Sequence, residues 1–222
     1  MGKKQDGFTL LELLIVIALM AILWGVAYTM FYQSGKVFSF SRNKLEKYQY
    51  ARMAMDGISR DLKGATLKDT TDYFKSFTKA EAAGLTPTPR DNSSILTFLS
   101  LTPNGSSTPV TLVTYYVNDA DELMRAEYND VSYIYGTVTG FNPADAVFYK
   151  LASNIDYFNL SFIYIYKNSG VSEVRVRNDW DSTNGDTAGR LPQAVKVVLQ
   201  IYGIGTGNVL ETGTFTAKIK LP

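Results

Sequence analysis

The side chain with the clearest chemical role in this sequence is Glu12, the only charge between Phe8 and Tyr32. The twenty residues that follow it carry no charge at all. A carboxylate in a membrane helix costs about 2.5–3.5 kcal/mol near the bilayer centre and less near the interface. Ionisable residues in such segments usually serve a function and have a partner of opposite charge. Glu12 is therefore the first candidate functional residue.

A cationic partner for Glu12 would arise if the chain were cut between Gly7 and Phe8. Phe8 would then carry a new α-amine, and Glu12 lies four residues further on, about one helical turn away. The carboxylate could pair with the amine of its own chain or with that of a neighbour. Pairing with a neighbour would remove two charges from lipid and set the stagger between the two chains.

Much other chemistry is excluded by composition. The 222 residues include no cysteine and no histidine, which rules out thiol nucleophiles, Ser-His triads, Cys/His zinc sites and disulfides. Lys and Arg number 22 against 21 Asp and Glu, so the net charge of +1 indicates no nucleic-acid binding. We expect no enzymatic activity and no cofactor.

A weak calcium candidate lies in one acidic loop. Its oxygen-bearing side chains are Asp179, Asp181, Asn184 and Asp186. Thr183 occupies the position where the EF-hand spacing requires the third ligand, so a solvated acidic loop is the default interpretation.

Aromatic residues make up 13% of the chain and are concentrated in one strand pattern, 155–166. Aromatic residues are enriched in interface cores. We expect Phe158, Leu160 and Phe162 to form the protein's own core. Three residues are left as candidate partner contacts: Trp180, Tyr164 and Tyr166.

The apolar run around Glu12 predicts a transmembrane helix over residues 8–32, since about 20 helical residues span a bilayer core. A cleaved secretory signal is disfavoured because the run exceeds 7–15 residues and no A-x-A-like site follows it. A plain membrane anchor would leave Glu12 unexplained. Beyond Tyr32, an apolar stripe at steps of three and four predicts an amphipathic helix over 33–65.

The two helical segments are expected to form one helix from Phe8 to about Lys63, with Gly64 as its stop. The stripe comprises Val37, Phe40, Leu45, Tyr48, Ala51, Met55, Ile58 and Leu62. Polar residues between these positions, Asp61 among them, are expected on the exposed face.

Residues 66–222 predict a mainly antiparallel β head, so the fold class is α+β. The composition of residues 66–94 predicts a loop that contains a short helix at 78–83. Alternation and turn signals predict strands at 95–101, 110–117, 122–128, 131–139, 155–166, 171–177, 195–202 and 212–221.

The start of the chain resembles the class III signal of type IV pilins and type II secretion pseudopilins. The resemblance is carried by a Lys-Lys-Gln-Asp-Gly leader, the segment Phe-Thr-Leu-Leu-Glu and the apolar run. It implies that a prepilin peptidase removes residues 1–7 by cutting after Gly7 and N-methylates Phe8. It also implies that Glu12 guides assembly of subunits into a filament. Many family members have a proline midway along the span, whereas the first proline here is Pro87.

The head resembles minor pseudopilin J of type II secretion systems and the related W-type minor pilins. Short segments carry this likeness: residues 55–62, 113–117, 122–127, 155–162, 178–181 and 190–197. The resemblance implies a helix carrying two β-sheets. It also implies a tip complex with minor pseudopilins of the I and K types, which primes assembly of the major pseudopilin into a short periplasmic filament.

Three functions follow as hypotheses. The first is a minor pseudopilin of type II secretion, and the second is a minor pilin of a type IV pilus or DNA-uptake filament. The third is a membrane-anchored periplasmic ligand-binding protein. Lys3 and Lys4 favour a cytoplasmic N-terminus in the inner membrane with the head in the periplasm, although basic residues at 36–47 score the opposite way. Expected partners are the peptidase, other pseudopilins and membrane lipid.

Overall fold

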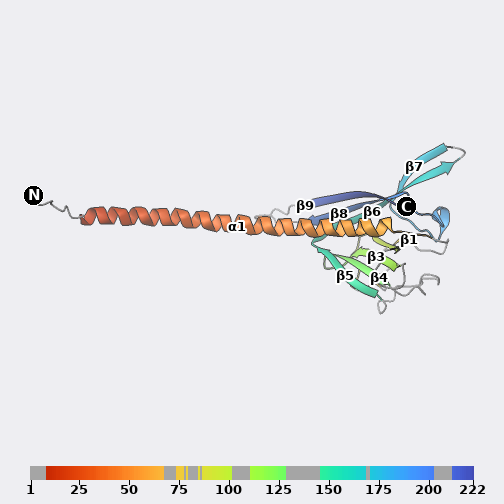
Figure 1. Ribbon diagram of the computed structural model, residues 1–222, viewed down its shortest axis with the longest axis horizontal. Coiled ribbons are helices and arrows are strands. Elements are labelled where there is room, and N and C mark those ends of the chain that lie inside the picture. The colour runs from red at the N-terminus through yellow and green to blue at the C-terminus, as the bar shows by residue number, and fades with distance from the viewer. Residues whose placement is uncertain are drawn as a thin grey trace, which may run out of the picture. The chain divides into compact units, whose positions relative to one another are not determined.

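The computed structural model describes residues 9–67, 74–77, 79, 85, 87–101, 111–128, 146–168, 171–202 and 212–222 (Figure 1). Contacts divide the chain into two compact units, Met1–Leu45 and Glu46–Pro222. The second unit contains the last part of the helix and both β-sheets.

One uninterrupted helix, α1, spans Leu10–Lys63. Its 54 residues correspond to about 80 Å at 1.5 Å per residue. The backbone N–H of Gly64 closes the last turn by donating to the carbonyl oxygens of Arg60 and Asp61, at 3.2 and 3.1 Å. The continuous helix and its stop at Gly64 are confirmed. Its expected first residue, Phe8, lies outside the described part of the chain, and Thr9 precedes the helix.

The strands form two antiparallel sheets. The five-stranded sheet has the order β1-β2-β3-β4-β5, with bounds Phe74–Phe77, Ile95–Ser100, Thr111–Val117, Glu122–Tyr128 and Ala146–Ser153. The four-stranded sheet has the order β7-β6-β8-β9, with bounds Val171–Arg177, Ile155–Asn168, Ala194–Tyr202 and Thr212–Lys220. A long N-terminal helix followed by two antiparallel sheets is the expected α+β, pilin-like arrangement.

The main core lies where the end of α1 and both sheets meet. It combines Ile58 and Leu62 from α1, Phe98 from β2, and Phe158 and Phe162 from β6, each at most 1% exposed. Strands alternate their side chains between two faces, which is why Phe158, Leu160 and Phe162 all point inward. Their predicted core positions are confirmed.

The two sheets differ in how their second faces are covered. The far face of the five-stranded sheet carries its own buried cluster, which includes Ile95, Leu112, Tyr116 and Met124. In the four-stranded sheet, β9 alternates between inward and exposed positions, with Lys218 and Lys220 exposed and Ile219 buried. The strand predicted at 212–221 is confirmed.

The structure corrects several sequence-based expectations. Strand β1 lies within 66–94, where a loop was expected, and β5 was not predicted at all. The expected strand at 131–139 lies outside the described residues, as does most of the short helix at 78–83.

The apolar stripe of α1 is buried only in its last part. Ala51, Met55, Ile58 and Leu62 are at most 7% exposed, whereas Leu45 is 62% exposed. Asp61, expected on the exposed face, is completely buried.

Candidate assembly site

Glu12 takes part in a reciprocal hydrogen-bonded cap at the start of α1. Thr9 donates to the Glu12 carboxylate through both its backbone N–H and its hydroxyl, each at 3.0 Å. The Glu12 N–H in turn donates to the Thr9 hydroxyl at 3.3 Å. This is a capping box, in which a Thr at the N-cap and a Glu at the third helical position satisfy N–H groups that have no partner within the helix.

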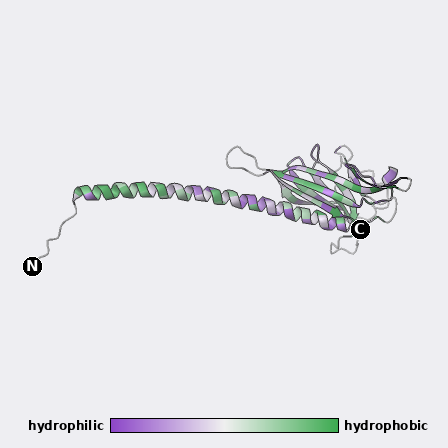
Figure 2. Ribbon diagram, turned by 90° about the horizontal axis from the view of Figure 1, so that it is seen from above, coloured by the Kyte–Doolittle hydropathy of each residue, from purple (hydrophilic) through white to green (hydrophobic). Residues whose placement is uncertain are grey.

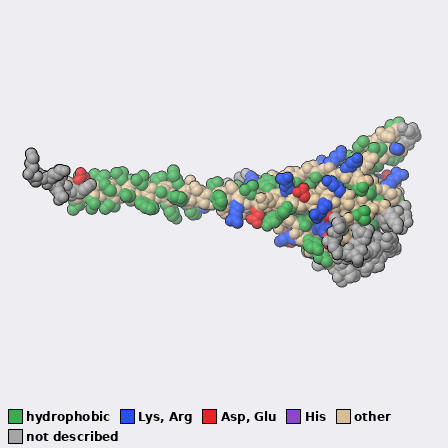
Figure 3. All heavy atoms as spheres, viewed as in Figure 1, with side chains coloured by type: hydrophobic (Ala, Val, Ile, Leu, Met, Phe, Trp, Pro, Cys, Tyr) green, Lys and Arg blue, Asp and Glu red, His purple; other side chains and the backbone are tan. Residues whose placement is uncertain are grey.

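The helix that follows Glu12 presents apolar side chains in every direction. Between Leu10 and Tyr32, large hydrophobic side chains are 49–82% exposed. Figure 2 shows continuous hydrophobic colouring along the N-terminal part of α1, and Figure 3 shows the same side chains as an apolar surface. This helix is long and apolar enough to cross a membrane, as a single-pass anchor does. A helix that is apolar all round requires lipid or other helices around it.

The sequence placed the processing site at Gly7 and Phe8, which lie outside the described residues. Glu12 is exposed within its own unit. Its carboxylate is therefore positioned by Thr9 at the surface of the helix, where a neighbouring chain can reach it.

Trp180, one of the three candidate partner contacts, belongs to the buried core. It is 3% exposed, and its indole Nε1 donates to the carbonyl oxygen of Arg190 at 3.1 Å. Its backbone N–H donates to the Ser76 hydroxyl at 2.8 Å. The indole also packs edge-on against Tyr164, with ring centroids 5.5 Å apart. These contacts attach the 178–182 segment to β1, and they leave the indole almost no surface for a partner.

The other two candidates, Tyr164 and Tyr166, are half-buried on β6. The guanidinium of Arg175 lies over the Tyr166 ring, 4.1 Å from its centroid. Both tyrosines line an open groove of about 1030 Å³, together with Trp180 and Leu191. The sequence thus grouped three residues that the fold brings to one groove, although they differ in exposure.

The acidic loop does not gather its carboxylates around a common point. Asp181 pairs with Lys75 at 3.0 Å, and Asp186 pairs with Arg177 at 2.7 Å. Asn184 accepts the N–H of Gly185 and so caps a short 3₁₀ turn. Within the described residues, no group of three or more carboxylates is arranged to hold a metal ion.

The electrostatics of this loop reflect its ion pairs. Burial raises the pKa of Asp181, but hydrogen bonds from Thr183 and the nearby Lys75 ammonium outweigh it, so the pKa is lowered overall. A hydrogen bond from Arg177 lowers the pKa of Asp186. Both carboxylates therefore stay ionised in partnership with basic residues of the same chain.

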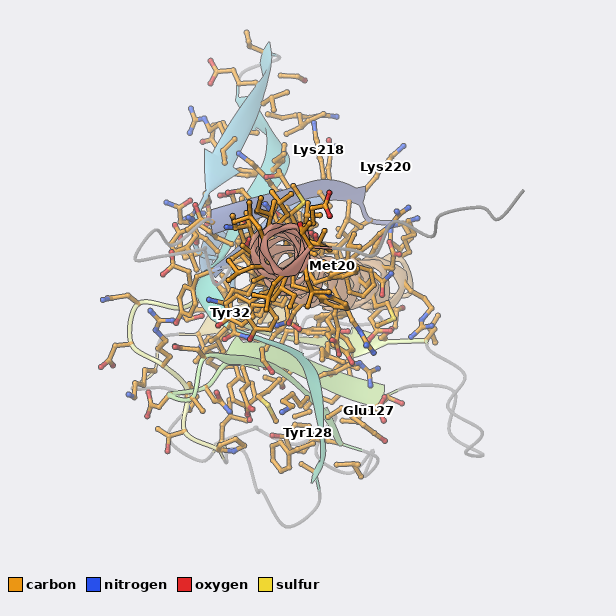
Figure 4. The ribbon with its side chains drawn as sticks, turned by 90° about the vertical axis from the view of Figure 1, so that its left-hand side faces the viewer. Met20, Tyr32, Glu127, Tyr128, Lys218 and Lys220 are labelled. Atoms are coloured by element: carbon orange, nitrogen blue, oxygen red, sulfur yellow. The ribbon has the colours of Figure 1, made fainter. Side chains whose placement is uncertain are left out.

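A buried polar network connects the end of α1 to the five-stranded sheet. The carboxylate of Asp61 accepts hydrogen bonds from the Tyr115 hydroxyl at 2.6 Å and from Arg125 Nε at 2.7 Å. Arg125 also pairs with Glu127, which Figure 4 labels on β4. Burial, with the nearby Asp61 charge, raises the pKa of Tyr115 well above its ordinary value. The network holds the helix end against β3 and β4.

Two residues of the cap and of the buried network, Thr9 and Asp61, were not identified from the sequence. Thr9 could have been found, because a Thr three residues before a Glu is the capping-box pattern. Asp61 carries no such signal, since its partners Tyr115 and Arg125 lie more than fifty residues away in the chain.

Comparison with known protein families finds the prokaryotic N-terminal methylation motif at residues 2–28. No curated protein and no solved structure matches the chain significantly. The matched segment contains Gly7, Phe8, Thr9 and Glu12. The motif indicates a type IV pilin-like protein, which implies processing by a prepilin peptidase and assembly with other pilin-type subunits.

Proposed function

We propose that this protein is a minor pseudopilin of a type II secretion system, part of the tip complex that primes pseudopilus assembly for protein export. The observation that carries the proposal is the methylation motif followed by an apolar helix with a single capped carboxylate. The short head segments that resemble minor pseudopilin J support the finer assignment. In this role the protein has no catalytic activity of its own.

The proposed mechanism begins with cleavage after Gly7 and N-methylation of Phe8. The mature chain starts with a cationic amine four residues before Glu12. In an assembly, the Glu12 carboxylate of one subunit would pair with the Phe8 amine of its neighbour, and this pairing would neutralise both charges in lipid. Thr9 holds the carboxylate in place until the amine arrives.

The orientation follows from the same proposal. Lys3 and Lys4 would stay in the cytoplasm, where the peptidase acts on the leader, and the β head would lie in the periplasm. The proposed partners are the I and K type minor pseudopilins and the major pseudopilin.

The test is intact mass and N-terminal analysis of the membrane-extracted protein, made with and without its prepilin peptidase. We expect a chain that starts at N-methylated Phe8 only when the peptidase is present. A chain that still starts at Met1, or that is cut after Tyr32, would overturn the assembly function. If Phe8 is found N-methylated, capture of the I and K type partners would distinguish a secretion system from a pilus.

The groove beside Tyr164 and Tyr166 is the observation that favours an anchored ligand-binding protein as the second candidate. Its volume of about 1030 Å³ lies at the upper end of the range for small-molecule sites. A substitution at Glu12 distinguishes the two candidate functions. Glu12→Ala would abolish assembly of a pilin-type subunit, but it would not impair a protein that uses the helix only as an anchor.

A further inference from the structure

The outer face of the four-stranded sheet carries an unusual distribution of charge. Lys196 on β8 lies directly opposite Lys218 on β9, and Lys220 follows two residues later on the same side. All three are exposed, and Figure 4 shows Lys218 and Lys220 projecting together from β9. Like charges directly opposite each other on a sheet are destabilising.

Among the described residues of their own face, from Tyr157 onward, no carboxylate offsets these lysines. The outer-face positions of β6, β8 and β9 in the described chain, beyond the bulge at Ile155/Tyr157, contain no Asp or Glu. From Tyr157 onward they are Tyr157, Asn159, Ser161, Ile163 and Ile165 on β6, Ala194, Val198, Gln200 and Tyr202 on β8, and Thr212, Thr214 and Thr216 on β9, besides Lys167 and the three lysines. The chain as a whole has a net charge of only +1, so this face is locally far more basic than the protein.

An exposed aliphatic patch adjoins the lysines. Ile163 pairs with both Val176 and Ala194, and Ala194 pairs with Lys220, so the patch and the lysines share one continuous face. Ile165 pairs with Val174 on the same side. Val174 and Val176 are 70% and 62% exposed, and Figure 3 shows hydrophobic side chains on this part of the surface.

Most of the aliphatic patch lies on a two-stranded ribbon formed by the end of β6 and by β7. Beyond Ile163, the end of β6 pairs only with β7 among the described strands, and β7 is the last strand of its sheet. Figure 1 shows this ribbon extending past the other strands. Two-stranded ribbons are marginally stable by themselves, and an open edge is a template for pairing with another chain.

We propose that this outer face, consisting of Lys196, Lys218 and Lys220 with Ile163, Ile165, Val174 and Val176, binds an acidic face of a partner subunit. Carboxylates of the partner lie over the three lysines, and its aliphatic side chains cover the ribbon. The identity of the partner as another pilin-type subunit rests on the proposed function; the charge and the apolar character of the surface do not.

A protein partner fits this surface better than lipid or nucleic acid. The outer-face positions in the described strands include no Trp or Phe, which membrane-surface binding favours. They also include no Arg, the residue that most often reads nucleic acids. The outer edge of β7, where no described strand pairs, offers backbone groups to which a strand of another polypeptide can add.

The absence of cysteine from the chain allows a clean test by crosslinking. The full-length variant Val174→Cys is labelled with a maleimide photo-crosslinker in membranes. The other subunits of the same organism that carry the N-terminal methylation motif serve as probes and are co-expressed with this variant one at a time. The matched control is Val147→Cys on β5, an exposed valine of the other sheet at 44%. We expect a crosslink to one of these subunits from position 174 and none from position 147.

A charge reversal then tests the lysines. The double change Lys196→Glu with Lys218→Glu should reduce the crosslink from position 174 at least about tenfold, because the partner's carboxylates would meet like charges. The control is Arg52→Glu with Lys63→Glu, two exposed basic residues of α1, which should leave the yield within about twofold.

The outcomes separate this inference from the proposed function. A crosslink only to lipid, no crosslink, or equal yields after either charge reversal would each overturn the docking surface. If N-methylated Phe8 and loss of assembly in Glu12→Ala were still found, the assembly function would stand without this docking surface. A crosslink specific to position 174 and sensitive to the lysine reversal, in a chain that keeps Met1, would support the surface and contradict the assembly function.

Discussion

Two carboxylates of α1, Glu12 near its start and Asp61 near its end, have opposite surroundings. Glu12 is exposed, and the hydrogen bonds that position it come from Thr9, three residues away. Asp61 is fully buried, and its partners Tyr115 and Arg125 come from strands of the five-stranded sheet. One carboxylate is therefore held by local structure and the other by tertiary structure.

This difference in burial determines which of the two carboxylates is available to another molecule. The carboxylate of Glu12 can exchange its Thr9 contacts for a cation from outside, because it is exposed among the described residues of its unit. Asp61 cannot, since it is fully buried, and breaking its ion pair would take a carboxylate from Arg125 and the acceptor from the Tyr115 hydroxyl. Glu12 is suited to assembly, whereas Asp61 is suited to hold the helix against the head.

The largest effect is expected at Glu12. Glu12→Ala should reduce assembly with pilin-type partners at least about tenfold, because the cationic N-terminus of a neighbour would lose its partner in lipid. Insertion into the membrane should be unchanged or slightly better. The measurement is the amount of assembled subunit recovered from membranes, relative to the total.

The control is Glu46→Ala, which removes another glutamate of α1 bonded only by Tyr50 among the contacts described. Assembly of this variant should match the unchanged chain. Equal loss in both variants would contradict the special role of Glu12.

At the other end of the helix, Asp61→Ala should lower the free energy of unfolding of the head by about 2–5 kcal/mol, because the buried Tyr115 hydroxyl would lose its acceptor and Arg125 would keep only Glu127 as a carboxylate partner. Denaturant unfolding of the full chain in detergent measures this. Asp56→Ala, an exposed position on the same helix, should change it by less than about 0.5 kcal/mol. Similar values for the two variants would show that the buried pair does not support the fold.

A third comparison uses two isoleucines of the same helix. Ile58→Ala removes a side chain that is 1% exposed and should cost about 2–5 kcal/mol of head stability. Ile22→Ala removes one that is 63% exposed and should leave head unfolding unchanged. A large loss in Ile22→Ala would mean that the apolar part of α1 contributes to the stability of the head.

The smallest effect is expected at the acidic loop. Because the pKa of Asp181 is lowered in the folded protein, its stabilising contribution is present above the unfolded pKa of about 3.9. It is lost as the pH falls through the lower folded value. Asp181→Asn should therefore destabilise the head by less than about 1 kcal/mol near neutral pH and by nothing at strongly acidic pH.

The control for this change is Asp179→Asn, whose side chain is 81% exposed. Unfolding curves at several pH values check both variants. A stability difference for Asp181→Asn that persists below about pH 2 would contradict the assigned ion pair.

The elements that the sequence predicted well have strong local patterns. Strand β6 was recognised because aromatic and polar residues alternate along it, and α1 because an apolar run continues into a stripe at helical spacing. Strand β1 was missed because its four residues, Phe74–Phe77, are too few to show a period. Trp180 was left open because burial of an aromatic residue in a loop depends on what folds over it, here β1 and the Arg190 carbonyl.

Sequence alone determined the apolar helix, its single carboxylate at position 12 and the methylation motif around it, because these depend on residues close together in the chain. Only the tertiary structure decided the burial of Asp61, the separation of the loop carboxylates into ion pairs, and the joining of three lysines with the β6–β7 ribbon on one face. The physical reason is that side-chain contacts across sheets join residues far apart in sequence, and no local period records which strands become neighbours.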